Sequence, residues 1–85
     1  MPYQVVLTNA ANKQLRKLPI QMAQRIQVQI FELENDPRPS GCKKLVDIEA
    51  WRIRIGDYRV IYEIHDNILL VSVIEIGHRK EIYKK

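Results

Sequence analysis

The chain begins with a short extended segment and then changes to helical spacing. Residues 3–7 form a run with high strand propensity. Apolar residues then recur every three or four positions over residues 10–18 and 20–34, which predicts two amphipathic helices. Pro19 separates them, because proline disfavours helical geometry at the preceding residue and suits the first turn of a following helix. The apolar stripes are Ala11, Leu15 and Leu18, then Ala23, Ile26, Ile30 and Leu33.

Beyond residue 41 the apolar positions recur at every second residue, as is typical of strands. A loop with two prolines and a glycine, residues 35–41, is expected to end the second helix near Glu34. Strands are expected over residues 42–46, 51–55, 58–64 and 68–76, with turns at 56–57 and 65–67 and with Gly77 ending the last strand. The pattern therefore predicts an α+β fold of order β-α-α-β-β-β-β. A helical hairpin would cover one face of a mainly antiparallel sheet, and the other face would be partly open.

Composition narrows the class of protein. At 85 residues, with 46% hydrophobic and 28% charged residues, the chain suits a single globular domain over residues 1–85. The single cysteine, Cys42, can form no intrachain disulfide and has no partners at zinc-site spacing. The sequence shows neither a signal peptide nor an apolar run of membrane-spanning length, so we expect a cytoplasmic protein that makes no membrane contact. The formal net charge of +4 suggests a polyanionic partner.

Arginines gather where the expected strands meet. Residues 51, 53 and 55 can enter the core while Arg52 and Arg54 project from the other face, because alternate side chains of a strand share a side. The turn at 56–57 brings Arg59 near this pair, and Arg79 follows the last strand. Four guanidinium groups can then converge, an arrangement suited to phosphate oxygens. The alternative is a solvated strand face with ordinary ion pairs to Glu49, Glu63 or Glu75.

Two residues near the C-terminus could move protons. His78 follows the last expected strand, and histidine has an ordinary pKa near neutrality. Tyr83 lies on the basic tail, where its ring could stack on a base and its hydroxyl could shuttle a proton. The chain has no glycine-rich phosphate loop, metal motif or nucleophile elbow, so we expect neither a metal nor a small-molecule cofactor.

The order of elements and two motifs resemble the RelE branch of the RelE/ParE toxin superfamily. The motifs are WRIRIGDYRVIY at residues 51–62 and IGHRKEIY at residues 76–83, and the first helix, which ends at Lys17-Leu18-Pro19, is also similar. The resemblance covers essentially the whole chain. It implies a toxin of a type II toxin–antitoxin system that acts as an endoribonuclease on mRNA in the ribosomal A site and so inhibits translation.

The resemblance also implies roles for particular residues. The chemistry would be metal-free attack of the ribose 2′-OH on the adjacent phosphate, leaving a 2′,3′-cyclic phosphate and a 5′-OH. Some relatives carry lysines where this chain has Arg52 and Arg54, and arginine has too high a pKa to act as a base, so proton transfer is left to Tyr83 or His78. The implied catalytic residues are Arg52, Arg54, Arg59, Arg79 and Tyr83, with His78 as a further candidate. The implied RNA-binding residues are Arg52, Arg54, Lys43, Lys44, Lys80 and Lys84.

The resemblance further implies two partners. These are a cognate RelB-like antitoxin with an extended acidic segment and the ribosome with mRNA in its A site, and the toxin–antitoxin assembly could be a heterotetramer or larger. Two other functions stay open: a ParE-like poison of DNA gyrase without nuclease activity, and a non-catalytic nucleic-acid-binding module. Converging arginines together with Tyr83 favour the ribonuclease, because a pure binding module does not need several phosphate ligands at one point.

Overall fold

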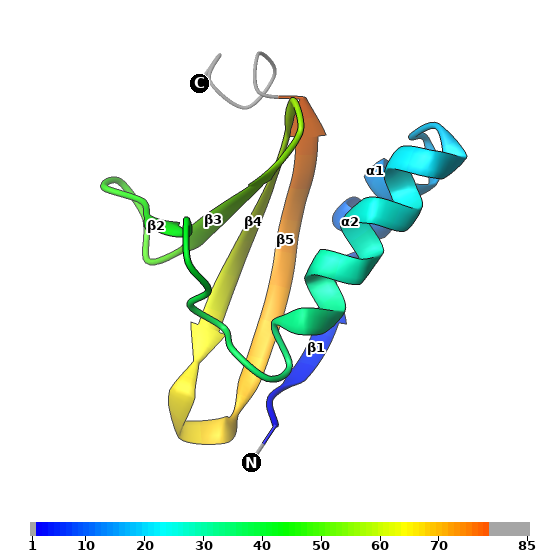
Figure 1. The fold of residues 1–85 in the computed structure, drawn as a ribbon. Coiled ribbons are helices and arrows are strands. Elements are labelled where there is room, and N and C mark those ends of the chain that lie inside the picture. The colour runs from blue at the N-terminus through cyan, green and yellow to red at the C-terminus, as the bar shows by residue number, and fades with distance from the viewer. Residues whose placement is uncertain (1, 79–85) are drawn as a thin grey trace.

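A five-stranded sheet carries two helices on one face in the computed structural model, which describes residues 2–78 (Figure 1). The sheet order is β1-β5-β4-β3-β2, with β1 parallel to β5 and the other neighbours antiparallel. The predicted α+β order is confirmed. The elements are β1 (Gln4–Leu7), α1 (Asn9–Arg16), α2 (Ile20–Glu32), β2 (Lys43–Lys44), β3 (Trp51–Ile55), β4 (Tyr58–His65) and β5 (Leu70–His78).

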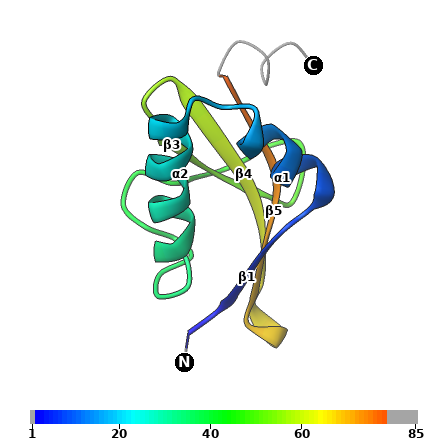
Figure 2. The ribbon, with the colours of Figure 1, turned by 90° about the vertical axis from the view of Figure 1, so that its right-hand side faces the viewer.

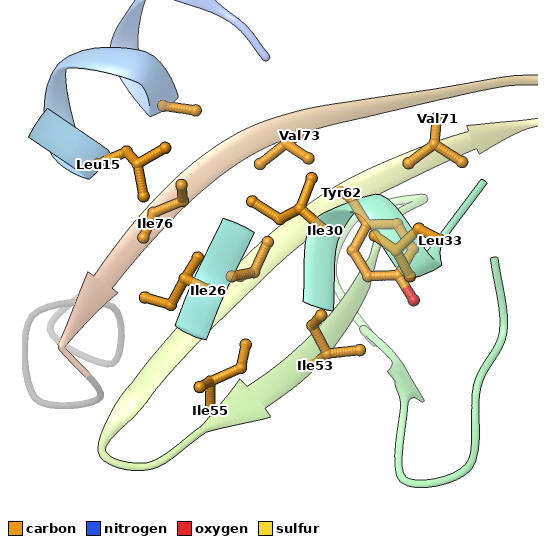
Figure 3. Close-up of a cluster of buried hydrophobic side chains, with 12 residues drawn as sticks. Leu15, Ile26, Ile30, Leu33, Ile53, Ile55, Tyr62, Val71, Val73 and Ile76 are labelled. Atoms are coloured by element: carbon orange, nitrogen blue, oxygen red, sulfur yellow. The ribbon is translucent and has the colours of Figure 1, made fainter. Parts of the chain in front are cut away.

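Each helix buries one stripe against the sheet. The Thr8 hydroxyl caps α1 by accepting a hydrogen bond from the backbone N–H of Ala11 at 3.2 Å. Helix α1 packs on β5 and β1, and α2 packs on β3, as the side view shows (Figure 2). The stripes from α1 and α2 meet the inward residues of β3, β4 and β5 in one core (Figure 3). Labelled members of this core are Leu15, Ile26, Ile30, Leu33, Ile53, Ile55, Tyr62, Val71, Val73 and Ile76.

Strands β1 and β4 differ from the expected bounds by one residue each, and β2 and β5 differ by more. Strand β2 has only two residues, because the chain bends back over residues 46–49; the N–H of Leu45 still donates to the carbonyl of Ala50, the opposite residue in the same register. Strand β5 starts at Leu70 rather than at residue 68, because Asp66–Ile68 form a 3₁₀ turn and Leu69 adopts a left-handed φ of 53°. The prediction that Gly77 ends β5 is wrong, since the strand continues through His78.

A bulge between β4 and β5 sets which residues share a face. Ile61 lies opposite Glu75 and Tyr62 lies opposite Val73, so Ile74 is an extra residue on β5. Because of this extra residue, Val73 and Ile76 both lie in the core, and Glu75 turns to the face away from the helices. The bulge therefore determines the side of the sheet to which each β5 residue from Glu75 to His78 projects.

Candidate nucleic-acid interface

Three arginines share the sheet face that lies opposite the helices. Arg54 of β3 is the cross-strand partner of Arg59 of β4, and Arg52 lies two residues from Arg54 on the same strand. The intervening pair, Ile53 and Val60, is in the core, so the arginines must project from the opposite face. We call Arg52, Arg54 and Arg59 the arginine face. The predicted convergence of these three residues on one side of the sheet is observed.

The charge of the arginine face is concentrated and only partly solvated. Arg52 is 8% exposed and Arg59 is 4% exposed, whereas Arg54 is exposed. Within residues 2–78 neither Arg52 nor Arg54 forms an ion pair, and the buried Nη1 of Arg52 has no hydrogen-bond partner there. A buried cationic donor without a partner is costly, and like charges directly opposite on neighbouring strands repel. An anion bound on this face would lower both costs.

The alternative of ordinary ion pairs stays open at Glu75, which lies opposite Ile61 on the same sheet face as the arginines, whereas the other two glutamates have partners elsewhere. Glu49 pairs with Lys44, with 3.1 Å between Oε1 and Nζ, and Glu63 contacts His65 at 3.2 Å. Both glutamates are therefore engaged with residues outside the arginine face. Two of the three arginines are buried rather than solvated.

The predicted RNA-binding lysines separate onto two faces. Lys43 is the cross-strand partner of Arg52, so it extends the arginine face onto β2. Lys44 is the partner of Trp51 and projects to the other side, where it pairs with Glu49. The remaining predicted site residues, Arg79, Lys80, Tyr83 and Lys84, lie outside the described residues.

His78 lies on the helix face of the sheet. Its cross-strand partner is Tyr58, and the two rings meet edge to face with centroids 5.5 Å apart and planes at 78°. Tyr58 packs against the hydrophobic core, so both rings lie on the same side as the helices. The structure therefore brings the three arginines together but does not bring His78 to them.

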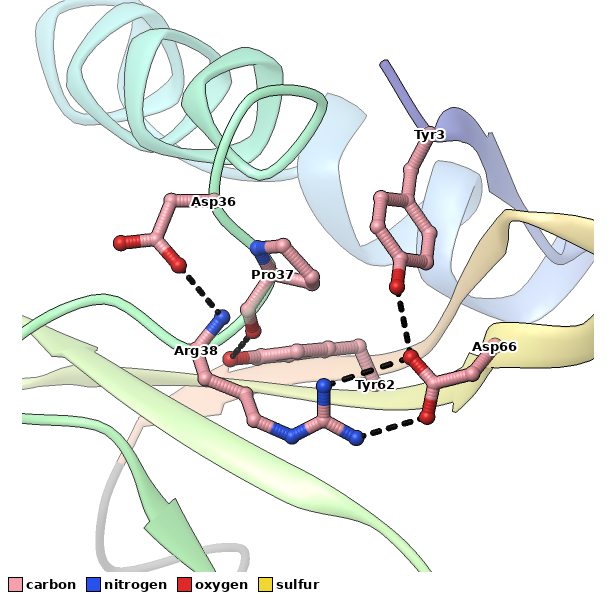
Figure 4. Close-up of polar contacts among 6 residues, drawn as sticks. All are labelled: Tyr3, Asp36, Pro37, Arg38, Tyr62 and Asp66. Carbon is pink, nitrogen blue, oxygen red and sulfur yellow. Dashed lines mark hydrogen bonds and ion pairs between the residues drawn. The ribbon is translucent and has the colours of Figure 1, made fainter. Parts of the chain in front are cut away.

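A polar cluster that the sequence did not reveal supports the start of β3. Tyr3 donates from its hydroxyl to Asp66 Oδ1 at 2.6 Å, and Arg38 binds both carboxylate oxygens of Asp66 at 3.3 and 2.9 Å (Figure 4). The guanidinium of Arg38 also lies 5.0 Å from the centre of the Trp51 ring. We call Tyr3, Arg38 and Asp66 the clasp. It ties the N-terminus, the loop after α2 and the β4–β5 turn to the residue that precedes Arg52.

The clasp shifts the ionisation of its members. The hydrogen bonds from Arg38 and then from Tyr3 hold the pKa of Asp66 below its usual value. The hydrogen bond to Asp66 raises the pKa of Tyr3. These shifts favour the charged carboxylate and the neutral phenol, which are the forms that the observed contacts need. No local sequence pattern signals this cluster, because Tyr3 and Asp66 are 63 positions apart.

The described part of the chain contains neither a cluster of metal ligands nor a membrane-spanning helix. Between residues 2 and 78 no three His, Cys, Asp or Glu side chains lie close enough together to hold a metal ion. Over the same residues no helix has the length and apolar character needed to cross a bilayer. Cys42 is a half-buried free thiol.

The chain as a whole has counterparts among toxins. Residues 5–83 match the family model described as the ParE toxin of type II toxin-antitoxin system, parDE, and the chain belongs to this family. Two curated relatives come from Mycobacterium tuberculosis. Toxin RelE is 35% identical over 85 residues, covering 98% of this chain and 88% of the relative, and Toxin RelG is 30% identical over 87 residues, covering 100% of both.

Solved structures give the same assignment. The RelBE2 toxin–antitoxin complex from M. tuberculosis matches with a TM-score of 0.83 and 29% identity, covering 93% of this chain and 100% of that one. The archaeal RelE–RelB complex from Pyrococcus horikoshii matches with a TM-score of 0.82 and 28% identity, covering 93% and 97%. The isolated E. coli RelE toxin matches with a TM-score of 0.79 and 26% identity, covering 95% and 90%. The chain is a RelE-like toxin, as its motifs indicated.

Proposed function

We propose that this RelE-like toxin is an endoribonuclease that cleaves mRNA in the ribosomal A site and so inhibits translation in the cytoplasm. The observation that carries the proposal is the arginine face, where three guanidinium groups from two strands share one side of the sheet. Two of them are buried, and the Nη1 of Arg52 lacks a hydrogen-bond partner within residues 2–78. A phosphodiester supplies the anionic oxygens that such donors bind. The RelE-named relatives support the same class of reaction.

The chemistry needs stabilisation of negative charge and movement of two protons. The 2′-oxygen attacks the adjacent phosphorus and loses its proton, and the bond from phosphorus to the 5′-oxygen breaks as that oxygen gains a proton. The products are a 2′,3′-cyclic phosphate and a 5′-OH. Arg52, Arg54 and Arg59 would stabilise the phosphorane, each by about 2.7–4 kcal/mol if it acts like one donor of an oxyanion hole. The guanidinium charges supply this stabilisation without a metal ion.

Proton transfer is assigned to residues other than the arginines. Arginine stays protonated at neutral pH and cannot act as the base. His78 projects to the helix face, which favours Tyr83 as the proton carrier for a phosphate on the arginine face. Arg79 would add a fourth guanidinium group by the same family correspondence. His78 remains the second candidate for proton transfer, since it lies at the end of β5, one residue from Gly77, the partner of Arg59.

We also propose a RelB-like antitoxin as the partner that controls the toxin, in a heterotetramer or a larger assembly. Several structural neighbours are RelE–RelB complexes, from M. tuberculosis, P. horikoshii and E. coli among others. The toxin carries a net charge of +4 and a basic sheet face. An acidic antitoxin segment would neutralise this face and block access of mRNA to it.

The direct test is to add the full-length protein to ribosomes paused on a defined mRNA, then to map the cut and identify its termini. We expect a cut within the A-site codon with a 2′,3′-cyclic phosphate and a 5′-OH. Intact mRNA after incubation with folded protein would contradict the proposal. Because the matching family model carries the ParE name, inhibition of DNA gyrase is the second function to assay on the same sample.

A further inference from the structure

A pocket of about 340 Å³ lies beside the end of β5, on the helix face. The end of α1 contributes Gln14 and Lys17 to its lining, and β4 and β5 contribute Tyr58, Gly77 and His78. This volume is at the lower end of the range of about 300–1,000 Å³ that is usual for small-molecule sites. The pocket therefore has room for one flat group rather than for a large ligand.

The pocket and the arginine face meet at Gly77. Gly77 is the cross-strand partner of Arg59 and also lines the pocket, and it places no side chain beside Arg59. The outer edge of β5 pairs with β1 only as far as Val73, after which α1 covers the edge through a 2.7 Å hydrogen bond from the N–H of Ile76 to Gln14 Oε1. Gly77 is the residue that follows this covered position, and it borders both the pocket and Arg59.

The lining suits a nucleobase. The rings of Tyr58 and His78 provide aromatic walls, and single-stranded RNA is commonly bound by stacking its bases on such rings. The Oε1 of Gln14 is used by Ile76, so the amide can still donate from its nitrogen to a base carbonyl. Lys17 adds an exposed positive charge at the rim.

We propose that this pocket holds the base of the RNA nucleotide adjacent to the phosphate on the arginine face. The inference rests on the proposed ribonuclease function, because it takes the ligand of the arginine face to be RNA. The pocket would add a second contact with the RNA, on the opposite side of the sheet, by binding one base beside the cut.

Nuclear magnetic resonance titration of the ¹⁵N-labelled full chain tests the proposal. The probe is a trinucleotide whose 2′-oxygens are methylated, so that it cannot be cleaved, and the comparison probes are the same trinucleotide with each base deleted in turn. We expect the intact probe to shift the backbone amides of Gly77 and His78 and the guanidinium signals of the arginine face. Deletion of one particular base should abolish the pocket shifts, retain the arginine shifts and weaken binding by about tenfold.

Matched variants assign the effect to the pocket. Lys17→Gln removes the rim charge, and Lys13→Gln makes the same change one helical turn earlier, at an exposed residue that does not line the pocket. Gln14→Glu keeps the acceptor for the N–H of Ile76 and places negative charge in the pocket. In Lys17→Gln and Gln14→Glu the roughly tenfold cost of deleting the base should fall below about threefold, and in Lys13→Gln it should be unchanged.

Two different failures are distinguishable. If the arginine signals shift and the pocket amides do not, RNA binds the arginine face and the pocket proposal is wrong. If no signal moves at millimolar RNA, this inference is wrong, and cleavage on paused ribosomes decides separately on the proposed function.

Discussion

Arg54 is the member of the arginine face that is best suited to a mutational test of the proposed chemistry. It is exposed, it makes no ion pair within residues 2–78, and it lies directly opposite Arg59. Replacing it by glutamine removes a phosphate ligand and also removes repulsion between two like charges. Loss of activity can therefore be separated from loss of folding at this position.

Arg54→Gln is expected to slow single-turnover mRNA cleavage on the ribosome by about 10²–10³-fold, the usual cost of removing one donor to a developing oxyanion. Its thermal midpoint should equal or slightly exceed that of the wild type, because the opposing positive charge is relieved. Cleavage at the wild-type rate would show that Arg54 is not a phosphate ligand in the reaction.

Tyr62 allows a test of the packing on the helix side of the same sheet. Its ring is fully buried in the core, and its hydroxyl donates to the carbonyl of Pro37 at 2.8 Å. Tyr62→Phe leaves that carbonyl without its donor and should reduce the free energy of unfolding by about 1–3 kcal/mol. Urea titration at neutral pH measures this loss, and a variant as stable as the wild type would mean that water replaces the hydroxyl.

The same residue predicts a pH dependence at the alkaline end. Burial raises the pKa of Tyr62, so the folded state holds the phenol proton more tightly than the unfolded state does. Its contribution to stability is therefore complete below the ordinary tyrosine pKa of about 10 and declines as the pH rises above that value. Tyr62→Phe should lack this decline, which thermal unfolding measured across the alkaline range would detect.

At the scale of elements, the clasp holds the loop after α2 against the sheet. Asp66 accepts hydrogen bonds from Tyr3 and Arg38, and Arg38 also contacts Trp51 at the start of β3. Asp66→Asn keeps the size of the side chain and removes its charge. Amide hydrogen exchange in residues 34–38 should become faster, because the Arg38 side chain would no longer hold this loop to the β4–β5 turn as firmly.

Acid should also speed amide hydrogen exchange of residues 34–38 in the wild type. The pKa of Asp66 is held below its usual value, so its stabilising contribution is present above about pH 4 and is lost as the pH falls through the lowered folded value. Exchange in this loop should thus converge between wild type and Asp66→Asn in strong acid. A constant difference at every pH would mean that the carboxylate charge does not hold the loop.

Sequence periodicity predicted the elements whose pattern is local. The stripe of Ile26, Ile30 and Leu33 and the alternation of residues 51–55 are visible without any partner, and both are observed. The shortness of β2 and the extension of β5 to His78 depend on cross-strand pairing. The residue pattern of a single strand does not show where such pairing ends. The bulge at Ile74 has the same origin, since only the register with β4 shows the extra residue.

The candidate site was predictable to the same extent. Arg52 and Arg54 were placed on one face by their spacing, and Arg59 by the short turn between β3 and β4. The separation of Lys43 from Lys44 requires the β2–β3 register. The side occupied by His78 requires the continuation of β5 past Gly77, so the sequence alone could not show that this ring faces away from the arginines.

At the scale of the whole molecule, charge should control association with the proposed antitoxin. A net charge of +4 and a basic sheet face favour an acidic partner, and such attraction is screened by salt. The affinity for a RelB-like antitoxin should therefore fall as salt is raised, and Arg54→Gln should make this decline less steep. Titration calorimetry over a range of salt concentrations tests this. An affinity independent of salt would indicate an interface dominated by apolar contacts.

The central claim is that the arginine face, rather than positive charge in general, performs RNA cleavage. The most direct measurement compares Arg54→Gln with Lys44→Gln on ribosomes paused at one codon. Both changes remove one exposed positive charge, but Lys44 projects to the other side and pairs with Glu49. We predict an A-site cut with a 2′,3′-cyclic phosphate that Lys44→Gln retains and Arg54→Gln slows by about 10²–10³-fold. Equal rates in the two variants, or no cut by the wild type, would contradict the claim.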